Sequence, residues 1–244
     1  MPWRRGFTLI EMLLVISLIT MLISITLPAL SKSRLTAREG ICGSNLRQAT
    51  IAFTAYSNDN NQLFPDMSYN PITKAQWSQP PYWQQPYFRD HLGALYGMRR
   101  EMWYSPTNDL WNRDDFWWYD TGNPATSNHF VSGFFYFGST LTSSAAFRNS
   151  LSNPPPNGMA AFPRRNGGSS YSNMIWADLN RRLSSHPTTW LTPGDARRWG
   201  SNHWYGNPDM VPHGSHRAFT DNHVDWITGS ELKMQSTYGA IMYW

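Results

Sequence analysis

The feature that most constrains this chain is an uninterrupted apolar stretch near its amino terminus. Residues 7–30 contain one charged side chain, Glu11, and no other residue more polar than Ser or Thr. As an α-helix, the stretch would extend roughly 36 Å, which is longer than the hydrocarbon core of a bilayer. Arg4 and Arg5 precede it and Lys32 follows it, and a short basic leader normally stays cytoplasmic. The sequence therefore predicts one membrane-spanning helix.

An ordinary cleaved signal peptide is the alternative for this segment. Ala29, Leu30 and Ser31 form a poor small-x-small cleavage site, but the apolar core of a signal peptide is at most about 15 residues long. A carboxylate inside a membrane segment costs about 2–3 kcal/mol and indicates a function that needs a partner. Because neither a signal peptide nor a simple anchor uses such a group, we favour a segment in which Glu11 meets a partner.

The rest of the chain is electrically neutral and rich in aromatic residues. The net charge of the 244-residue chain is +4, and residues 1–47 carry that whole excess, whereas residues 48–244 hold equal numbers of basic and acidic side chains. A neutral body offers no basic face for phosphate backbones, so no nucleic-acid partner is predicted. The 13 Trp exclude general disorder. The single Cys excludes an intrachain disulfide and a multi-cysteine zinc site.

A second helical pattern continues directly from the apolar stretch. Pro28 is expected to kink the helix without ending it, because membrane helices tolerate proline. Gly40 and Gly43 weaken the helix by about 1 kcal/mol each, and the turn-forming residues 57–61 are expected to stop it. We interpret Cys42 as a buried small apolar residue. Apolar residues at helical spacing form a stripe that is expected to pack on a globular partner: Leu35, Cys42, Leu46, Ala49, Phe53 and Tyr56.

The remaining residues predict a β-rich head with long loops. Residues 66–125 are loop-like because they contain many Pro and Trp residues, and the β-formers at 130–137 and 171–177 predict strands. The expected fold class is α+β: a long amino-terminal helix, whose first half spans the membrane, packed on an antiparallel β-sheet head.

The clearest hairpin prediction joins residues 217–220 to residues 223–227. Asp221 and Asn222 both tolerate the positive φ of a two-residue type I′ turn. This turn would place Phe219 opposite Val224 and Ala218 opposite Asp225, with Phe219, Val224 and Trp226 on one face and Thr220, His223 and Asp225 on the other. On this interpretation, Asp221, Asn222 and His223 serve the fold and have no catalytic role.

A metal or acid–base site is the functional alternative for the last 70 residues. Candidate ligands crowd this region, but we find no His-Glu-x-x-His motif, no calcium-loop pattern and no neighbouring cysteine in the sequence. Ser215 lacks the Gly-x-Ser-x-Gly elbow of a serine hydrolase. The sequence thus predicts neither a metal nor an enzyme. The candidate ligands for a shared ion are His213, His216, His223 and Asp225, and the other acidic and histidine residues in the region are Asp178, Asp195, His203, Asp209 and Asp221.

The amino-terminal octet Arg4-Arg5-Gly6-Phe7-Thr8-Leu9-Ile10-Glu11 resembles the type III leader of type IV pilins and type II secretion pseudopilins. The resemblance implies that a prepilin peptidase cuts between Gly6 and Phe7 and methylates the new amine of Phe7. It also implies that Glu11 neutralises the terminal amine of a neighbouring subunit during filament assembly. Buried ion pairs of this kind set the register between helices.

A second resemblance concerns a subgroup of pseudopilin-like proteins. Cys42-Gly-Ser-Asn45-Leu46-Arg47-Gln48 and the later Tyr56-Ser-Asn58-Asp59 are similar to this subgroup's pattern at the end of the first helix. Its carboxy-terminal His…Asp-Gly-His-Val motif has its counterpart in His213 and Asp221-Asn222-His223-Val224. Here Asn222 replaces the glycine, and the spacing from His to Asp is shorter. Some pseudopilins hold a calcium ion in a late loop, but no matching residue run is visible here.

These resemblances imply a structural subunit and a domain order. Residues 1–6 would be the leader, 7–30 the membrane or filament-core helix, 31–60 its continuation, and 61–244 the head. The subunit would sit in the inner membrane with its short amino terminus in the cytoplasm and its head in the periplasm or outside the cell. It would assemble into a type II secretion pseudopilus or a type IV-like filament, with other subunits and an inner-membrane assembly platform as partners.

The alternative function is a membrane-anchored binding module whose Trp-rich head holds polysaccharide. Aromatic residues with a polar atom suit sugar-stacking surfaces, and we note Trp77, Trp83, Trp117 and Trp118 as a candidate contact patch. We favour a simpler role for most of the tryptophans, which is to form the core of a head that contains few Leu and Ile residues.

Overall fold

The structure is a computed structural model of the 244-residue chain. The chain forms two compact units, residues 1–40 and residues 41–244, and each is described here by itself. The described residues are 7–70, 75–76, 81–108, 111–118, 129–138, 145–156, 159–183, 186–190, 201–203, 212–236 and 241–244.

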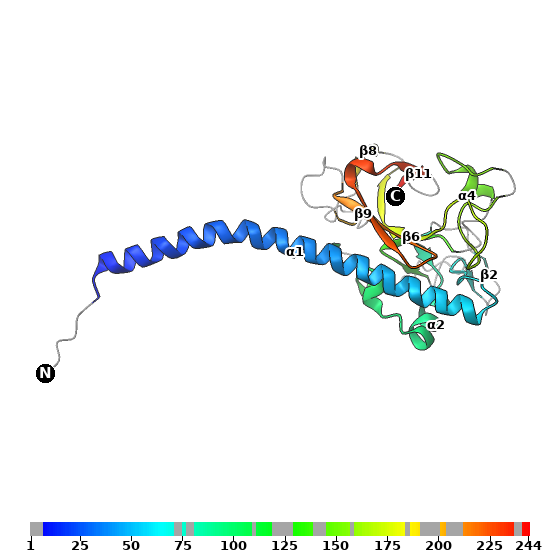
Figure 1. Cartoon of the computed structure of the whole chain (residues 1–244), viewed down its shortest axis with the longest axis horizontal. Coiled ribbons are helices and arrows are strands. Elements are labelled where there is room, and N and C mark those ends of the chain that lie inside the picture. Colours follow the sequence, from blue (N-terminus) through cyan, green and yellow to red (C-terminus); the bar gives the residue numbers. More distant parts are fainter. Residues whose placement is uncertain are drawn as a thin grey trace. The chain divides into compact units, whose positions relative to one another are not determined.

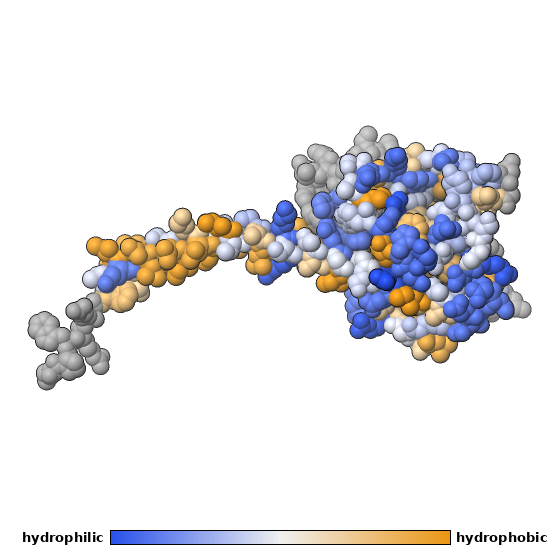
Figure 2. Space-filling model, in the orientation of Figure 1, coloured by the Kyte–Doolittle hydropathy of each residue, from blue (hydrophilic) through white to orange (hydrophobic). Residues whose placement is uncertain are grey.

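Helix α1 (Leu9–Asp59) runs without a break through Pro28, so the proline does not end the helix, as predicted. The helix ends within the turn-forming residues 57–61, also as predicted. Between residues 9 and 30, the large apolar side chains are 43–76% exposed, and Figure 2 shows hydrophobic residues covering this part of the helix. Among the described residues, α1 is the one helix that is long and apolar enough to cross a membrane.

The part of α1 that belongs to the second unit is amphipathic. Five of the six predicted stripe residues, from Cys42 to Tyr56, are buried, and Leu35 in the first unit is half-buried. Thr50 is also buried, and its hydroxyl donates to the carbonyl of Leu46, which satisfies the polar group within the helix. The stripe prediction is therefore correct within the head, and the buried face of residues 41–59 is part of its core.

The head also contains antiparallel sheets, which confirms the α+β class (Figure 1). One four-stranded sheet has the order β10-β9-β6-β5 and the other has the order β11-β12-β7-β8, while β1-β2 and β3-β4 are two-stranded. The strands are β1 (Tyr69–Asn70), β2 (Ala75–Gln76), β3 (Trp83–Gln84), β4 (Phe130–Val131), β5 (Phe134–Tyr136), β6 (Met174–Asp178), β7 (Asn180–Leu183), β8 (His186–Trp190), β9 (Gly214–Phe219), β10 (Val224–Thr228), β11 (Met234–Ser236) and β12 (Ile241–Tyr243).

The region predicted to be loop-like contains helices, which is a correction. Pro86 occupies the first turn of α2 (Pro86–Tyr96), where a missing N–H costs nothing. Gly97 closes this helix in the left-handed conformation with φ 70°. The prolines that suggested loops therefore include one that starts a helix. The helices η1 (Arg100–Trp103) and α3 (Asp114–Trp117) also lie in this region. Elsewhere in the described part of the head there are α4 (Ala145–Asn149) and η3 (Gly229–Glu231).

The strand predicted at 130–137 is divided into β4 and β5. The amide of Ser132 donates to the carbonyl of Tyr82, and the amide of Gly133 donates to the carbonyl of Trp103. Because these two amides bond outside the ladder, the predicted strand is interrupted at residues 132 and 133. Its first part, β4, pairs with β3, and its second part, β5, pairs with β6. The strand predicted at 171–177 begins later, at Met174.

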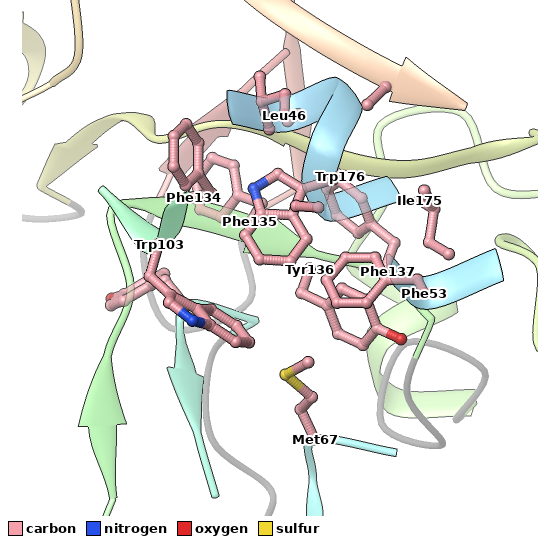
Figure 3. Packing of buried hydrophobic residues seen from close by; sticks show 14 of the residues in the cluster. Leu46, Phe53, Met67, Trp103, Phe134, Phe135, Tyr136, Phe137, Ile175 and Trp176 are labelled. Atoms are coloured by element: carbon pink, nitrogen blue, oxygen red, sulfur yellow. The ribbon is translucent and has the colours of Figure 1, made fainter. Parts of the chain in front are cut away.

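The core of the head is aromatic, as expected from its composition. Phe53 of α1 stacks on Trp176 of β6 with ring centroids 4.8 Å apart, and Trp103 lies 5.4 Å from the same indole (Figure 3). The largest completely buried aromatic side chains are Trp103, Trp111, Trp176, Tyr104, Tyr136, Phe53, Phe64, Phe130, Phe134, Phe135 and Phe137. Most of the aromatic residues in the described part of the head thus serve its core.

The hairpin of β9 and β10 exists, but the predicted register is wrong by one residue. Ala218, and not Phe219, lies opposite Val224, and Arg217 lies opposite Asp225. The amide of Asn222 donates to the carbonyl of Phe219, and the amide of Phe219 donates to the carbonyl of His223. These bonds define a three-residue loop in which only Asn222 has positive φ, 66°. A three-residue loop in place of the two-residue turn moves every pair by one position.

Candidate functional site

At the start of α1, Thr8 and Glu11 cap the helix. The amide and the hydroxyl of Thr8 both donate to Oε2 of Glu11, at 2.8 and 2.9 Å. The amide of Glu11 lies 3.3 Å from the Thr8 hydroxyl. This is the capping-box arrangement, in which residues three apart satisfy each other's helix-terminal groups. The Thr-x-x-Glu spacing is the sequence signal for this cap, which was not among the predictions.

The processing site flanks this cap. Gly6 lies outside the described residues, and Phe7 is 73% exposed just before the helix begins. Both bonds from Thr8 end on one oxygen of Glu11. The other carboxylate oxygen is therefore not engaged by the capping box.

A second candidate site lies inside the head, where four ligand-type side chains meet. Cys42 of α1, Asp178 at the end of β6, His203 and His216 of β9 each contribute one atom, and these atoms lie within 4.8 Å of one another. Cys42, Asp178 and His203 are completely buried and His216 is 8% exposed. Thiolate, carboxylate and imidazole are all groups that bind transition metals.

Asp178 is the centre of this cluster. Its Oδ2 lies 2.8 Å from Nε2 of His203 and 3.1 Å from Nδ1 of His216, and it accepts the backbone amide of His216 at 2.7 Å. Burial by itself raises the pKa of the Asp178 carboxyl. The charge of His203 and the hydrogen bonds from both histidines together outweigh that effect and hold the pKa below its usual value.

Neighbouring polar groups fix the orientation of the cluster. The Ser105 hydroxyl donates to Sγ of Cys42 at 3.3 Å, and Nδ2 of Asn202 donates to Oδ1 of Asp178 at 2.9 Å. Thr107 accepts the backbone amide of His203 at 3.0 Å. His203 adopts a φ of 51°, a left-handed conformation that is uncommon for a non-glycine residue. Such strained residues are often found at functional sites.

Glycine and tryptophan bring His216 close to the helix and cover it. A Cβ on Gly43 would lie 3.1 Å from the His216 ring, so the absent side chain makes room for the imidazole. On the other side, the indole of Trp226 packs edge-on against His216 and His203, with centroids 4.6 and 4.9 Å apart. Gly214 allows this packing, since a Cβ there would lie 2.2 Å from the indole.

Of the four ligands suggested for a shared ion, only His216 belongs to the cluster. His213 is exposed at the start of β9, where its amide donates to the carbonyl of His203. His223 bonds instead to Asp221 in the exposed hairpin loop. Asp225 pairs with Arg217, its neighbour across the hairpin.

The cluster brings together residues that lie far apart in the sequence. Cys42 is buried as expected, but it also lies 3.5 Å from Oδ1 of Asp178, a residue 136 positions away. The sequence contains no local spacing motif that connects the two residues. Only His203 and His216, which approach to 3.3 Å, were near enough in sequence to suggest a pair.

The aromatic surface offers a weaker site. Trp83 and Trp117 are partly buried, Trp77 lies outside the described residues, and Trp118 is 65% exposed. Trp118 packs on the buried guanidinium of Arg89, 4.4 Å from the ring centroid. A cavity of about 200 Å³ lies elsewhere, lined in part by Phe162, Tyr171, Phe219 and Trp244, and it is smaller than typical small-molecule sites of roughly 300 Å³ or more.

Among the described residues, a long apolar helix continues into a head that contains antiparallel sheets, and this helix is compatible with a membrane anchor. The prokaryotic N-terminal methylation motif matches residues 4–27. This match and the long apolar helix support the type IV pilin and pseudopilin class, whose members are substrates of prepilin peptidase. No curated protein and no solved structure shows significant similarity to the chain.

Proposed function

We propose that the protein is a structural filament subunit of the pseudopilin type. Prepilin peptidase cleaves it between Gly6 and Phe7 and methylates the amine of Phe7. The apolar helix then joins those of other subunits in a type II secretion pseudopilus or a type IV-like filament. The single observation that carries this proposal is the methylation motif over residues 4–27, at the start of a helix whose apolar side chains are exposed.

The geometry at Glu11 supports a role in pairing subunits. Thr8 binds one carboxylate oxygen of Glu11. The second oxygen can therefore accept the methylated amine of a neighbouring chain without breaking the cap. In an apolar environment, each of these two charges is costly alone, so their pairing favours one axial register between subunits. We place the helix in the inner membrane before assembly, with the leader in the cytoplasm.

Mass spectrometry of the mature chain tests the processing step. In a bacterial host with a prepilin peptidase, we expect the chain to begin with N-methylated Phe7. A chain that retains Met1, or that begins near Lys32, would contradict the proposal.

Two variants separate the charge of Glu11 from its role as a cap. Glu11→Gln keeps a carbonyl oxygen for Thr8 but has no charge, whereas Thr8→Ala weakens the cap and keeps the charge. We expect Glu11→Gln and Glu11→Ala to be processed normally and to be excluded from filaments, while Thr8→Ala still assembles. Normal assembly of Glu11→Gln would refute charge pairing.

A further inference from the structure

We propose that Cys42, Asp178, His203 and His216 form a structural zinc site in the core of the head. The inference rests on the described residues of the head alone, so it holds whether or not the chain assembles into a filament. The ligands come from α1, from the end of β6, from the segment 201–203 and from β9. A bound ion would therefore join four segments that are distant in sequence.

The donor set suits zinc in both chemistry and charge. Zinc binds thiolate sulfur, imidazole nitrogen and carboxylate oxygen, and its structural sites have four protein ligands in a tetrahedron. A thiolate from Cys42 and the carboxylate of Asp178 supply two negative charges, which balance a divalent ion. With four protein ligands, the site has no open position for substrate, so its role is structural. Calcium and magnesium are disfavoured because they prefer oxygen ligands.

The distances fit an ion after small movements. In a tetrahedral zinc site with bonds of about 2.0–2.3 Å, ligand atoms lie roughly 3.3–3.8 Å apart. The two histidine nitrogens are 3.3 Å apart, and Sγ of Cys42 is 3.5 Å from Oδ1 of Asp178. Oδ2 of Asp178 lies somewhat closer to the two histidines, at 2.8 and 3.1 Å. The remaining pairs of ligand atoms lie within 4.8 Å of one another, so shifts of up to about 1 Å would bring all four ligands to the spacing of a tetrahedral site.

Hydrogen-bond donors around the four side chains hold the ligand atoms in position, as they do in metal sites generally. Ser105 donates to the cysteine sulfur and Asn202 donates to the carboxylate. Nδ2 of Asn202 also donates to the carbonyl of Gly133 at 2.7 Å, which fixes the amide. Such partners orient the ligands and tune their affinity for the metal. The edge-on indole of Trp226 shields both imidazoles from solvent.

Metal analysis and cobalt substitution of the full-length chain, purified in detergent without chelator, test the site. We expect stoichiometric zinc in the purified protein. After removal of the zinc, added Co²⁺ should produce a near-ultraviolet sulfur-to-cobalt charge-transfer band. Cys42→Ser should abolish the band, and His223→Ala should retain it because His223 lies in the exposed hairpin loop. Absence of bound zinc together with absence of the band in the unmodified chain would overturn the proposal.

A pair of glycine variants tests the geometry without removing a ligand. A Cβ at Gly43 would lie 3.1 Å from the His216 ring, whereas a Cβ at Gly40 meets no atom within 4 Å. Both substitutions favour the helix similarly. We expect Gly43→Ala to weaken Co²⁺ binding about tenfold or more and Gly40→Ala to leave it unchanged. Equal affinities in the two variants would contradict the placement of His216 as a ligand.

Unfolding measurements distinguish an ion from a network of hydrogen bonds. If the site holds zinc, a chelator lowers the thermal unfolding midpoint of the head in the unmodified full-length chain, because zinc binding stabilises only the folded state. The chelator should leave the midpoint of the Cys42→Ser variant unchanged. If hydrogen bonds alone hold the four side chains together, the chelator changes neither midpoint. The second result would refute the zinc site.

Discussion

Two parts of helix α1 use apolar residues in opposite ways. Between residues 9 and 30, large apolar side chains are 43–76% exposed, whereas Cys42, Leu46 and Phe53 are completely buried. Both parts are α-helical, but the first part is apolar on all sides, whereas the second part has its buried apolar residues on one stripe. The difference lies in what they contact. The second part packs on β-sheets of its own chain, whereas among the described residues of the first unit no other element packs on the apolar part. An exposed apolar helix requires lipid or other helices to cover it, which agrees with an assembling subunit.

The largest expected effect is on the stability of the aromatic core, on which the buried part of α1 packs. Trp176 is completely buried and packs on Phe53 and Trp103. Trp176→Ala should therefore lower the free energy of unfolding of the head by about 3–5 kcal/mol, measured by chemical denaturation. Trp118→Ala, at a 65% exposed position, is the control and should change it by about 0.5–1 kcal/mol, because it mainly loses the contact of the ring with Arg89. Equal losses would show that the core does not depend on the buried indole.

Substitutions of two exposed leucines, one in each unit, test whether the apolar segment of α1 is inserted in a membrane. Leu18 of α1 is 58% exposed and Leu95 of α2 is 65% exposed. Leu18→Lys should cost about 2.5–3.5 kcal/mol in membrane insertion and shift the protein from the membrane to the soluble fraction. Leu95→Lys should leave the distribution unchanged, because that leucine lies on the folded head. If both variants remain in the membrane, residues 7–30 do not span it.

Alkaline pH should unfold the head and not the apolar segment, since residues 7–40 contain no tyrosine. Burial raises the pKa of Tyr56 to about 12, and burial also raises the pKa of Tyr104 and Tyr136. The unfolded chain releases these protons first, near pH 10, so stability is complete below pH 10 and falls as pH rises toward 12. The expected loss is about 1 kcal/mol per pH unit for each tyrosine.

Denaturation at a series of pH values, with tyrosinate absorbance as a second signal, measures this loss. Tyr56→Phe removes one of the tyrosines whose pKa is raised in the folded head, so the stability of the variant should fall less steeply above pH 10. An identical slope in the variant would contradict the assigned role of Tyr56.

The smallest expected effect on stability comes from the hydrogen bond between α1 and the hairpin loop. Thr54 of α1 donates to Oδ1 of Asn222 at 3.0 Å, so the loop residue with positive φ also binds the helix. Thr54→Ala should cost about 1 kcal/mol in the unmodified head and much less when combined with Asn222→Gly. A double-mutant cycle of unfolding free energies measures the coupling. Additive effects would show that the bond contributes nothing.

The sequence predicted the amino-terminal segment more fully than the head. An apolar run, the helix stripe from Cys42 to Tyr56 and the turn-forming residues 57–61 are local signals, and the structure follows them. The hairpin was also predicted, but its register was not, because Asp221-Asn222 is compatible with both a two-residue turn and a three-residue loop. Pro86 suggested a loop because the same residue type both begins helices and breaks them.

The buried cluster could not be predicted from the sequence. Cys42 and Asp178 are 136 positions apart, and each has an ordinary local explanation as a helix-stripe residue or a strand end. The sequence determined the apolar helix and its capping box because neighbouring residues suffice for both. Only the tertiary structure decided which cysteine, carboxylate and imidazoles meet, because that depends on the pairing of β6 with β9 and on how closely the helix approaches His216 at Gly43.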